Sequence, residues 1–264
     1  MRKLLILLVV VALPSVAMML PATSLPAGSP HQPDMITRPP FGVRLVAGKG
    51  GVSRKLFFGN TIGNIGDGPL ELRAENSSAT GTTNAVQEIY THGASKGPGG
   101  SLVLVSSASI GTFAFHPAHN HWHMGDFAQY ELRSINVDGS TGAVVATTKK
   151  TSFCMIDTDT IDSSLTHFGM GLSHSCGQSA RQGVKVGMGD TYSAFLSDQY
   201  IDITTIADGT YRLVSVADPN TAERPGGRLQ ETNDHNNAAS VDVTITRTAV
   251  TIIPGTAQTL IDAP

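Results

Sequence analysis

The sequence contains little charge, few aromatic residues and almost no cysteine. Only 15% of its 264 residues are charged, the formal net charge is −3, and Lys and Arg form no run. This pattern argues against nucleic-acid binding, which needs a basic surface, and against a coiled coil. Two cysteines cannot supply a four-cysteine zinc site or hold together a disulfide-built miniprotein. With 40% hydrophobic residues, the chain is nevertheless long enough to bury a core.

The N-terminal segment has the pattern of a secretory signal peptide. Arg2 and Lys3 precede an apolar run that Pro14 interrupts, and small residues follow it. The alternative is a membrane anchor, because the run over residues 4–20 just reaches the length of a tilted span. We predict a signal peptide over residues 1–20, no membrane span after its removal, and a secreted (extracellular or periplasmic) protein. Its removal deletes two positive charges and takes the formal charge from −3 to −5.

The rest of the chain is predicted to be one all-β domain. Residues 21–33 are expected to form a Pro-rich linker, residues 34–250 the domain, and residues 251–264 a C-terminal tail. Short β-prone runs alternate with Gly, Asn, Asp and Pro clusters, which is typical of an irregular β-sandwich or barrel. The expected strands are 43–46, 55–60, 70–73, 102–105, 113–115, 119–135, 143–148, 200–205, 211–216 and 240–247, with long loops at 76–100 and 155–189.

The strongest local signal is a run of four histidines at positions 116, 119, 121 and 123. On a β-strand, residues two apart point to the same face, so His119, His121 and His123 would present three imidazoles together. Their Cα atoms would span about 13 Å, and the outer side chains can lean inward toward one ion. Neutral imidazole binds copper, zinc, iron or nickel, and three protein ligands leave positions for water or substrate. The spacing does not choose the metal, and a polar strand face without metal is the alternative. His116 is out of phase and is expected outside the ligand set.

The remaining reactive side chains are predicted to have structural roles. Cys154 and Cys176 can pair in an oxidising compartment, closing a loop of about 20 residues worth about 3 kcal/mol. Four other histidines stand alone in the sequence and are expected to be polar surface residues: His31, His92, His167 and His174.

Further motifs follow the histidine run in a fixed order. They are Lys-Thr-Ser-Phe-Cys at 150–154, Asp-Thr-Tyr at 190–192, Tyr-Ile-Asp-Ile-Thr at 200–204, Gly-Thr-Tyr-Arg-Leu at 209–213 and Glu-Thr-Asn-Asp-His-Asn-Asn at 231–237. Together with the histidines, this series resembles the lysyl oxidase family, the copper- and quinone-dependent amine oxidases of the extracellular space. The resemblance covers roughly residues 33–245. The short N-terminus and sparse cysteines resemble a bacterial lysyl oxidase-like protein.

The resemblance implies an activity and a role for each motif residue. His119, His121 and His123 would bind Cu(II), and Lys150 and Tyr192 would be joined as lysyl tyrosylquinone. In that chemistry copper and O₂ oxidise the tyrosine, and the lysine amine adds to its ring. The finished enzyme would convert a primary amine or a peptidyl lysine, with O₂ and water, into an aldehyde, NH₃ and H₂O₂.

The resemblance also implies a calcium site that ties the start of the domain to a loop near its end. Oxygen ligands of this kind suit Ca²⁺. Asn233 stands where the family has Asp, which removes a charge that the neighbouring Asp234 could restore. An Asn-rich turn without metal is the alternative. The implied ligands are Asp34, the Met35 carbonyl, Glu231, Asn233, Asn236 and Asn237.

Two departures from the family pattern leave other functions open. Gln129 replaces a family histidine, and the loop between Cys154 and Cys176 is longer than the family's. One alternative is a non-catalytic extracellular β-domain that binds a metal through the same histidines. Another is a metal-assisted hydrolase in which the histidine site activates water. Lys150 and Tyr192 discriminate among these functions, because only the oxidase needs both.

Overall fold

A computed structural model describes residues 29–76, 81–92, 101–148, 151–177, 180–220 and 226–260. Within these ranges the chain consists of strands and loops, with a single 3-10 turn, η1, at Lys49–Gly51. This confirms the all-β prediction. The described part contains no helix that could cross a membrane. The predicted signal peptide, residues 1–20, lies outside it.

The strands of the described residues form three antiparallel sheets. A five-stranded sheet has the order β11-β4-β5-β6-β7. A second sheet has the order β16-β15-β14-β8-β9, with β17 also paired to β15, and a third has the order β1-β3-β12-β10, with β2 and β13 also paired to β3. Their bounds are β1 Met35–Thr37, β2 Phe41–Ala47, β3 Arg54–Asn64, β4 Leu70–Ala74, β5 Thr82–His92, β6 Leu102–His116, β7 His121–Met124, β8 Ala128–Ile135, β9 Thr141–Thr147, β10 Asp159–Thr160, β11 Arg181–Val184, β12 Met188–Tyr192, β13 Tyr200–Asp202, β14 Gly209–Ala217, β15 Ala238–Ile245, β16 Val250–Ile252 and β17 Gln258–Leu260.

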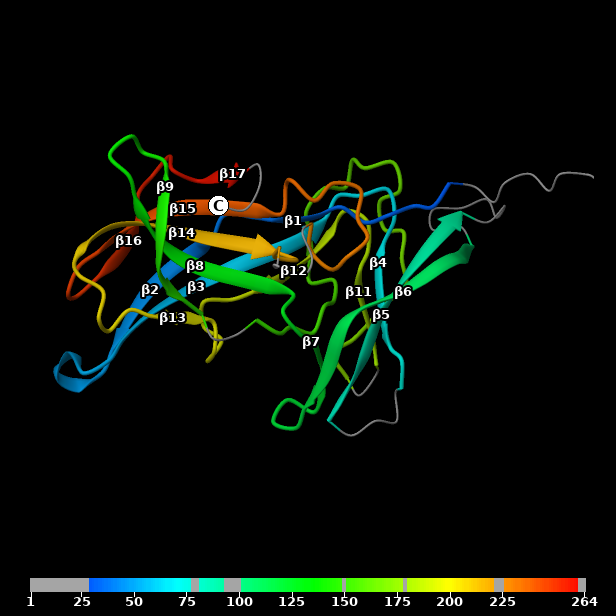
Figure 1. The fold of residues 1–264 in the computed structure, drawn as a ribbon, viewed down its shortest axis with the longest axis horizontal. Coiled ribbons are helices and arrows are strands. Elements are labelled where there is room, and N and C mark those ends of the chain that lie inside the picture. Colours follow the sequence, from blue (N-terminus) through cyan, green and yellow to red (C-terminus); the bar gives the residue numbers. More distant parts are fainter. Residues whose placement is uncertain are drawn as a thin grey trace, which may run out of the picture.

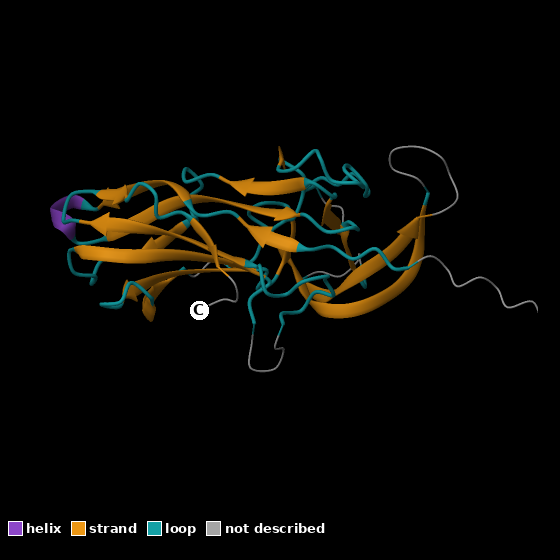
Figure 2. Ribbon diagram, turned by 90° about the horizontal axis from the view of Figure 1, so that it is seen from above, coloured by secondary structure: helices purple, strands orange, loops and turns teal. Residues whose placement is uncertain are grey.

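The molecule is elongated, and the five-stranded sheet lies at the opposite end from most strands of the other two sheets. β8, β14 and β15 lie beside β2 and β3 at one end, and the five-stranded sheet occupies the other (Figure 1). Seen from above, the first end has the layers of a sandwich, while the β5–β6 pair curves away from it (Figure 2). The arrangement therefore matches the predicted irregular sandwich, and β7 stands near the junction of the two ends.

A row of aromatic rings runs through the core at this junction. Phe58 of β3 and Tyr130 of β8 meet edge to face with their centroids 5.0 Å apart. Tyr130 in turn meets Phe153 at 6.1 Å, and all three rings are buried. Such edge-to-face pairs add about 0.5–1.5 kcal/mol beyond the burial of apolar area. The row anchors the segment from 151 to 155, which carries part of the motif series, to the centre of the fold.

Several predicted strand boundaries were wrong. The runs at 102–105 and 113–115 belong to one strand, β6. The predicted strand at 119–135 is two strands, β7 and β8, separated by a bend at which Asp126 adopts a left-handed φ of 49°. The sheet also continues past the boundary expected at residue 250, because β16 and β17 both pair with β15.

The loop predicted over 76–100 contains β5, and the loop predicted over 155–189 contains β10 and β11. β5 was missed because its middle is polar yet buried. Gln87 is 1% exposed and exchanges hydrogen bonds with the backbone of Gln230. Glu88 is bonded to Arg73, Arg181 and Tyr90. These partners come from distant segments, so the sequence of β5 alone gives no sign of them.

Candidate metal centre

The histidine run lies at the tip of the β6–β7 hairpin. His116 and His121 form its last cross-strand pair, and residues 117–120 make the turn between them. The amides of His119 and Asn120 donate to the His116 carbonyl at 3.0 and 2.8 Å, and Asn120 has a φ of 56°. His121 and His123 therefore lie two apart on a strand, as predicted. The prediction that His119 continues that strand was wrong, because the turn folds it back toward β7.

The turn brings the three imidazoles together. His121 Nε2 lies 2.9 Å from His123 Nε2, and His119 Nδ1 lies 3.4 Å from the same atom. Neighbouring nitrogens on a metal with bonds of about 2.0 Å are separated by about 3 Å, so these three could share one ion. His123 is buried, and its Nδ1 lies 3.3 Å from Ser152 Oγ, which fixes the ring with Nε2 toward the other histidines. This donor set suits copper or zinc.

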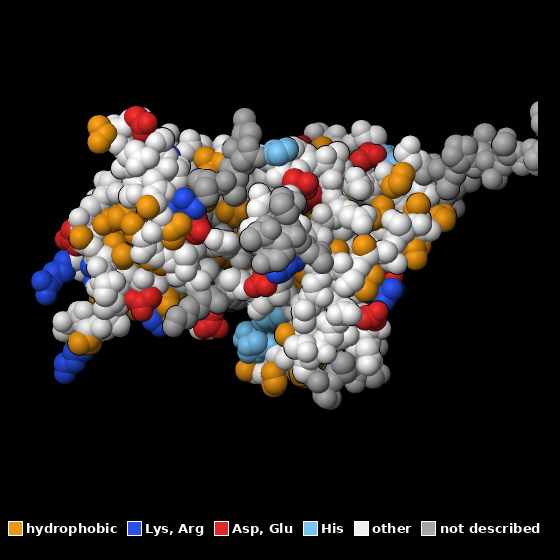
Figure 3. All heavy atoms as spheres, in the orientation of Figure 1, with side chains coloured by type: hydrophobic (Ala, Val, Ile, Leu, Met, Phe, Trp, Pro, Cys, Tyr) orange, Lys and Arg blue, Asp and Glu red, His pale blue; other side chains and the backbone are white. Residues whose placement is uncertain are grey.

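Histidine side chains gather visibly at this edge of the molecule, in the region of β7 (Figure 3). The His116 ring stacks on His119 with centroids 4.1 Å apart. Its Nδ1 is buried and has no hydrogen-bond partner among the described residues. The hairpin tip therefore presents four imidazoles, of which three converge and the fourth packs behind them.

A cavity of about 360 Å³ opens beside these histidines. This volume falls within the range of small-molecule sites. Among the described residues that line it, Asp198 is the only carboxylate, and it is exposed. The lining residues are His116, His119, His123, Thr148, Ser152, Asp198 and Tyr200.

Tyr192 lies against the same short segment that borders His123. Phe153 forms a two-way backbone pair with Met124 of β7, at 2.7 and 3.0 Å. The Tyr192 ring meets Phe153 edge to face at 4.7 Å, and its hydroxyl donates to the Cys154 carbonyl at 2.7 Å. Lys150 lies outside the described residues, directly before this segment. The structure thus brings Tyr192 and the histidines to one segment and leaves the lysine undescribed.

The surroundings of Tyr192 keep its phenol protonated. Burial and the nearby Asp190 carboxyl both raise the pKa of Tyr192 above its usual range. Burial also raises the pKa of Asp190 to about 8, although hydrogen bonds from the Ile156 backbone and from Tyr192 oppose this. Asp190 is 3% exposed, and its Oδ2 finds no hydrogen-bond partner in the described part of the chain. Asp190 is therefore a buried carboxyl beside Tyr192.

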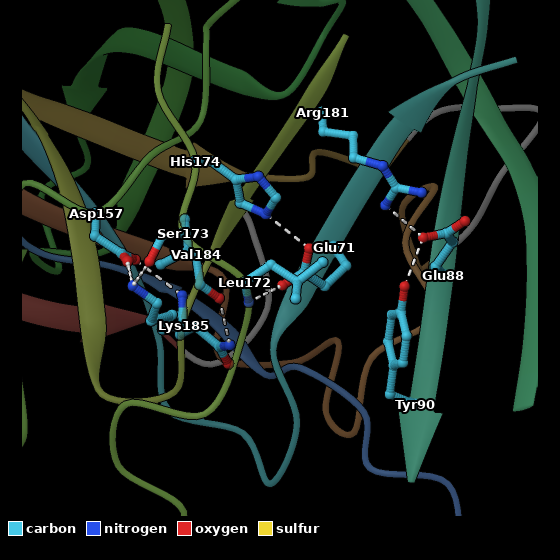
Figure 4. Close-up of polar contacts among 11 residues, drawn as sticks. Glu71, Glu88, Tyr90, Asp157, Leu172, Ser173, His174, Arg181, Val184 and Lys185 are labelled. Carbon is cyan, nitrogen blue, oxygen red and sulfur yellow. Dashed lines mark hydrogen bonds and ion pairs between the residues drawn. The ribbon is translucent and has the colours of Figure 1, made fainter. Parts of the chain in front are cut away.

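The predicted disulfide is present, and it closes a loop that polar contacts hold against the rest of the fold. Cys154 and Cys176 are bonded with their Cα atoms 5.9 Å apart. Glu71 of β4 accepts hydrogen bonds from the Leu172 amide at 2.6 Å and from His174 Nε2 at 2.7 Å (Figure 4). The His174 side chain is 5% exposed, so the prediction that it is a surface residue was wrong.

Two more contacts in Figure 4 hold the same region in place. Lys185 Nζ reaches Asp157 at 3.0 Å and Ser173 at 3.1 Å, and so joins the two halves of the loop. On β5, Glu88 pairs with Arg181 at 2.9 Å, which ties β11 to the sheet. The loop between the two cysteines is therefore held by the disulfide at its ends and by Lys185 and Glu71 at points within it.

Two other histidines expected to be isolated also have a common partner. His31 and His167 both contact Asp67, although they lie far apart in the sequence. The side chain of His92 lies outside the described part of the structure.

The implied calcium residues meet where the start of β1 approaches the loop before β15. Glu231 accepts hydrogen bonds from the Met35 amide at 2.6 Å and from Asn237 Nδ2 at 2.8 Å. Asn236 Nδ2 donates to Asp34 at 2.8 Å. The Oδ1 atoms of Asp234, Asn236 and Asn237 are buried and have no hydrogen-bond partner among the residues described.

This group of oxygens fits a hard cation, but its membership differs from the implied set. Burial raises the pKa of Glu231 to about 8, as expected for a carboxyl that lacks a compensating positive charge. Asn233 is exposed, and its Oδ1 accepts a hydrogen bond from the His235 amide at 3.1 Å. Asp234, which the sequence offered as a substitute for the missing family aspartate, has a buried Oδ1.

The family model for lysyl oxidase matches residues 100–254, which is more than half of the chain. The chain belongs to the lysyl oxidase family. The matched region runs from the start of β6 to just beyond β16, so it contains the histidine hairpin, Tyr192 and the loop before β15. The family predicted from the motif series is thereby confirmed.

Individual relatives agree over a shorter stretch. Lysyl oxidase homolog 3A of Danio rerio is 34% identical over 110 residues, which are 41% of this chain and 13% of that protein. Lysyl oxidase homolog 1 of Homo sapiens is 38% identical over 103 residues, 39% of this chain and 16% of that protein. The chain thus spans a small part of the length of these relatives.

Proposed function

We propose that this protein is a secreted copper-dependent amine oxidase that acts on primary amines. The observation that carries the proposal is the convergence of His119, His121 and His123 beside the segment 151–155, which also contacts Tyr192. Membership of the lysyl oxidase family supports it. The roles of the individual residues rest on this geometry and on the motif series.

The three imidazoles would hold copper, and the chain positions them before any metal arrives. Ser152 orients the His123 ring, and the turn at residues 117–120 places His119. The bound copper, with O₂, would supply the oxidation that joins Tyr192 to Lys150 as lysyl tyrosylquinone, the group that takes electrons from the amine. In the sequence, Lys150 directly precedes the segment 151–155, whose Ser152 contacts His123 and whose Phe153 contacts Tyr192.

The chain's own residues fix the Tyr192 ring and provide for its proton. The edge-to-face contact with Phe153 and the hydrogen bond to Cys154 set the ring's position. The phenol must lose its proton before it is oxidised, and Asp190 is the buried carboxyl that lies beside it. We assign Asp190 the role of holding that proton. Burial raises the pKa of Asp190 to about 8, so the carboxylate form that can accept the proton becomes more populated as the pH rises toward 8.

The cavity beside the histidines suits a cationic substrate. Asp198 provides a carboxylate in its lining that can attract a primary ammonium group. The ring of Tyr200, which also lines the cavity, offers an apolar surface to the substrate stem. A lysine side chain combines an aliphatic stem with an ammonium head, so we propose peptidyl lysine or a similar alkylamine as the substrate, with O₂ as the oxidant.

We further propose that Ca²⁺ binds the oxygens contributed by Asp34, Glu231, Asp234, Asn236 and Asn237. The buried oxygens without hydrogen-bond partners support this assignment. The ion would fasten the start of β1 to the loop before β15. It would have no part in the reaction. The signal peptide over residues 1–20 and an extracellular or periplasmic location remain predictions that fit an oxidase dependent on copper and O₂.

The test combines copper content with amine-dependent peroxide production. We expect wild-type protein to bind one copper at the histidine hairpin and to release H₂O₂ with an alkylamine. His121→Gln should lose the hairpin copper and the activity, while Tyr192→Phe should keep the hairpin copper and lose the activity. His235→Gln, which removes an exposed histidine outside the hairpin, is the control and should behave as wild type. Turnover by Tyr192→Phe would refute the quinone assignment.

A non-catalytic metal-binding domain is the second candidate function. It is favoured by the burial of Tyr192, which raises the pKa of the phenol and so disfavours the phenolate that is oxidised. Gln129, in place of a family histidine, is hydrogen-bonded to Glu131 and offers no proton-transfer group. Copper-loaded wild-type protein that releases no peroxide with any primary amine would support this second function over the first.

A further inference from the structure

Three side chains from distant parts of the sequence converge near the start of the described chain. His31 Nδ1 lies 2.6 Å from Asp67 Oδ2, and His167 Nδ1 lies 2.6 Å from Asp67 Oδ1. The two imidazole rings meet edge to face with centroids 5.0 Å apart. One potential ligand atom from each residue lies within 4.8 Å of the others.

The backbone fixes the place of all three residues. The His31 amide donates to the Tyr90 carbonyl at 2.9 Å, and the Gly68 amide donates to the Gln32 carbonyl at 2.8 Å. A Cβ on Gly68 would lie 2.0 Å from the His31 carbonyl oxygen, so only glycine lets the two segments approach this closely. His167 Nδ1 also lies 3.0 Å from the backbone carbonyl of Asp67. The cluster is therefore part of the fold's framework.

We propose that His31, Asp67 and His167 form a second metal site, separate from the copper histidines, for a borderline divalent cation such as Zn²⁺. Two imidazole nitrogens and one carboxylate suit Zn²⁺ and its neighbours in the transition series, whereas Ca²⁺ and Mg²⁺ prefer oxygen ligands alone. With both imidazoles neutral, the cluster carries one negative charge that a cation would offset.

The geometry needs only a small change to accept an ion. Ligand atoms that share a metal with bonds of about 2.0–2.1 Å lie about 3 Å apart, slightly more than the 2.6 Å of each nitrogen-to-oxygen contact. Rotation of the two rings and of the Asp67 carboxylate opens this distance. The Asp67 side chain is 58% exposed, so the ion has a route from solvent and room for water as a further ligand.

The site would fasten three segments together. His31 belongs to the strand-like entry before β1, Asp67 to the β3–β4 turn, and His167 to the long loop between Cys154 and Cys176. A metal held by one ligand from each would couple the start of the described chain to that loop. This inference does not depend on the proposed copper chemistry.

The test measures Zn²⁺ binding where the copper histidines cannot contribute. In a background with His119, His121 and His123 changed to Gln, isothermal titration should show one bound Zn²⁺. Adding His31→Gln or His167→Gln should weaken binding by more than about 100-fold, since loss of even an outer-shell partner costs 10–100-fold. Adding His235→Gln, an exposed histidine outside both clusters, should change nothing.

A milder variant guards against loss of folding. Asp67→Asn keeps the shape of the side chain and one of its two acceptor oxygens but removes the negative charge, so it should preserve the circular dichroism spectrum while weakening Zn²⁺ binding at least 10-fold. Absence of Zn²⁺ binding in the triple-Gln background up to 1 mM (roughly the weak limit of specific binding) would overturn the proposal. Binding that survives the His31 and His167 substitutions would also overturn it, whatever the outcome at the copper site.

Discussion

Removing the Cys154–Cys176 disulfide should destabilise the protein by a predictable amount. The two cysteines are separated by 22 positions, and closing a loop of this length in the unfolded chain is worth about 3.4 kcal/mol. The folded loop should stay in place without the bond, because Glu71 still holds Leu172 and His174. The loss therefore acts mainly by increasing the freedom of the unfolded chain. For a protein of this size it should lower Tm by about 7–14 °C.

Equilibrium urea unfolding of metal-free protein measures this loss. The sequence has one tryptophan, Trp122, and it is 3% exposed in β7, so its fluorescence reports unfolding next to the histidine hairpin. The double variant Cys154→Ala/Cys176→Ala should unfold at lower urea concentration with a similar slope. Reduced wild-type protein should shift by nearly the same amount, and reductant should have no effect on the variant.

Two results would refute this reasoning. A loss below about 1 kcal/mol would mean that the unfolded chain is already restrained, so the bond adds little. A much larger loss together with a lower slope would mean that the folded loop has come apart. In the second case the Cys154 carbonyl would no longer hold the Tyr192 hydroxyl, and copper-dependent modification of Tyr192 should fail as well.

Three further predictions concern buried polar groups. Asp190 has a pKa raised from 3.8 to about 8, so its stabilising contribution is complete below pH 3.8 and is lost as the pH rises to 8. Over this range the free energy of unfolding should fall by up to about 1.4 kcal/mol per pH unit, and Asp190→Asn should flatten that fall. Parallel pH curves for the wild type and the variant would contradict this prediction. Ca²⁺ at 100 times its Kd should stabilise wild-type protein by about 2.7 kcal/mol in thermal unfolding, and Glu231→Gln should abolish most of this gain; a wild type indifferent to Ca²⁺ would exclude the site. His174→Ala leaves the buried Glu71 without its imidazole partner and should cost about 3 kcal/mol in urea unfolding, whereas a cost below 1 kcal/mol would show that the Leu172 amide suffices.

The fold class followed from the sequence because most strands bury apolar side chains in short runs between turn residues. β14 and β15 show this pattern clearly, and both were predicted within a few residues. β5 was not predicted, because Gln87 and Glu88 are buried by partners far away in the chain. A local pattern cannot reveal such partners.

Only the part of the candidate site that depends on local sequence spacing was predicted correctly. The spacing of His121 and His123 is a local property of a strand, and the structure agrees with it. His119 joins them through a turn, which the two-residue period does not describe. The meeting of His31 with His167 at Asp67 depends wholly on tertiary structure, so the sequence presented these histidines as isolated.

The most direct test of the central proposal is peptide mass spectrometry on protein produced with copper and air. The account predicts a cross-link that joins the peptide containing Lys150 to the peptide containing Tyr192, with the mass change of quinone formation. The same peptides should be unlinked in His121→Gln protein, because it lacks copper. Copper-loaded wild-type protein in which both peptides run separately and unmodified would contradict the oxidase proposal.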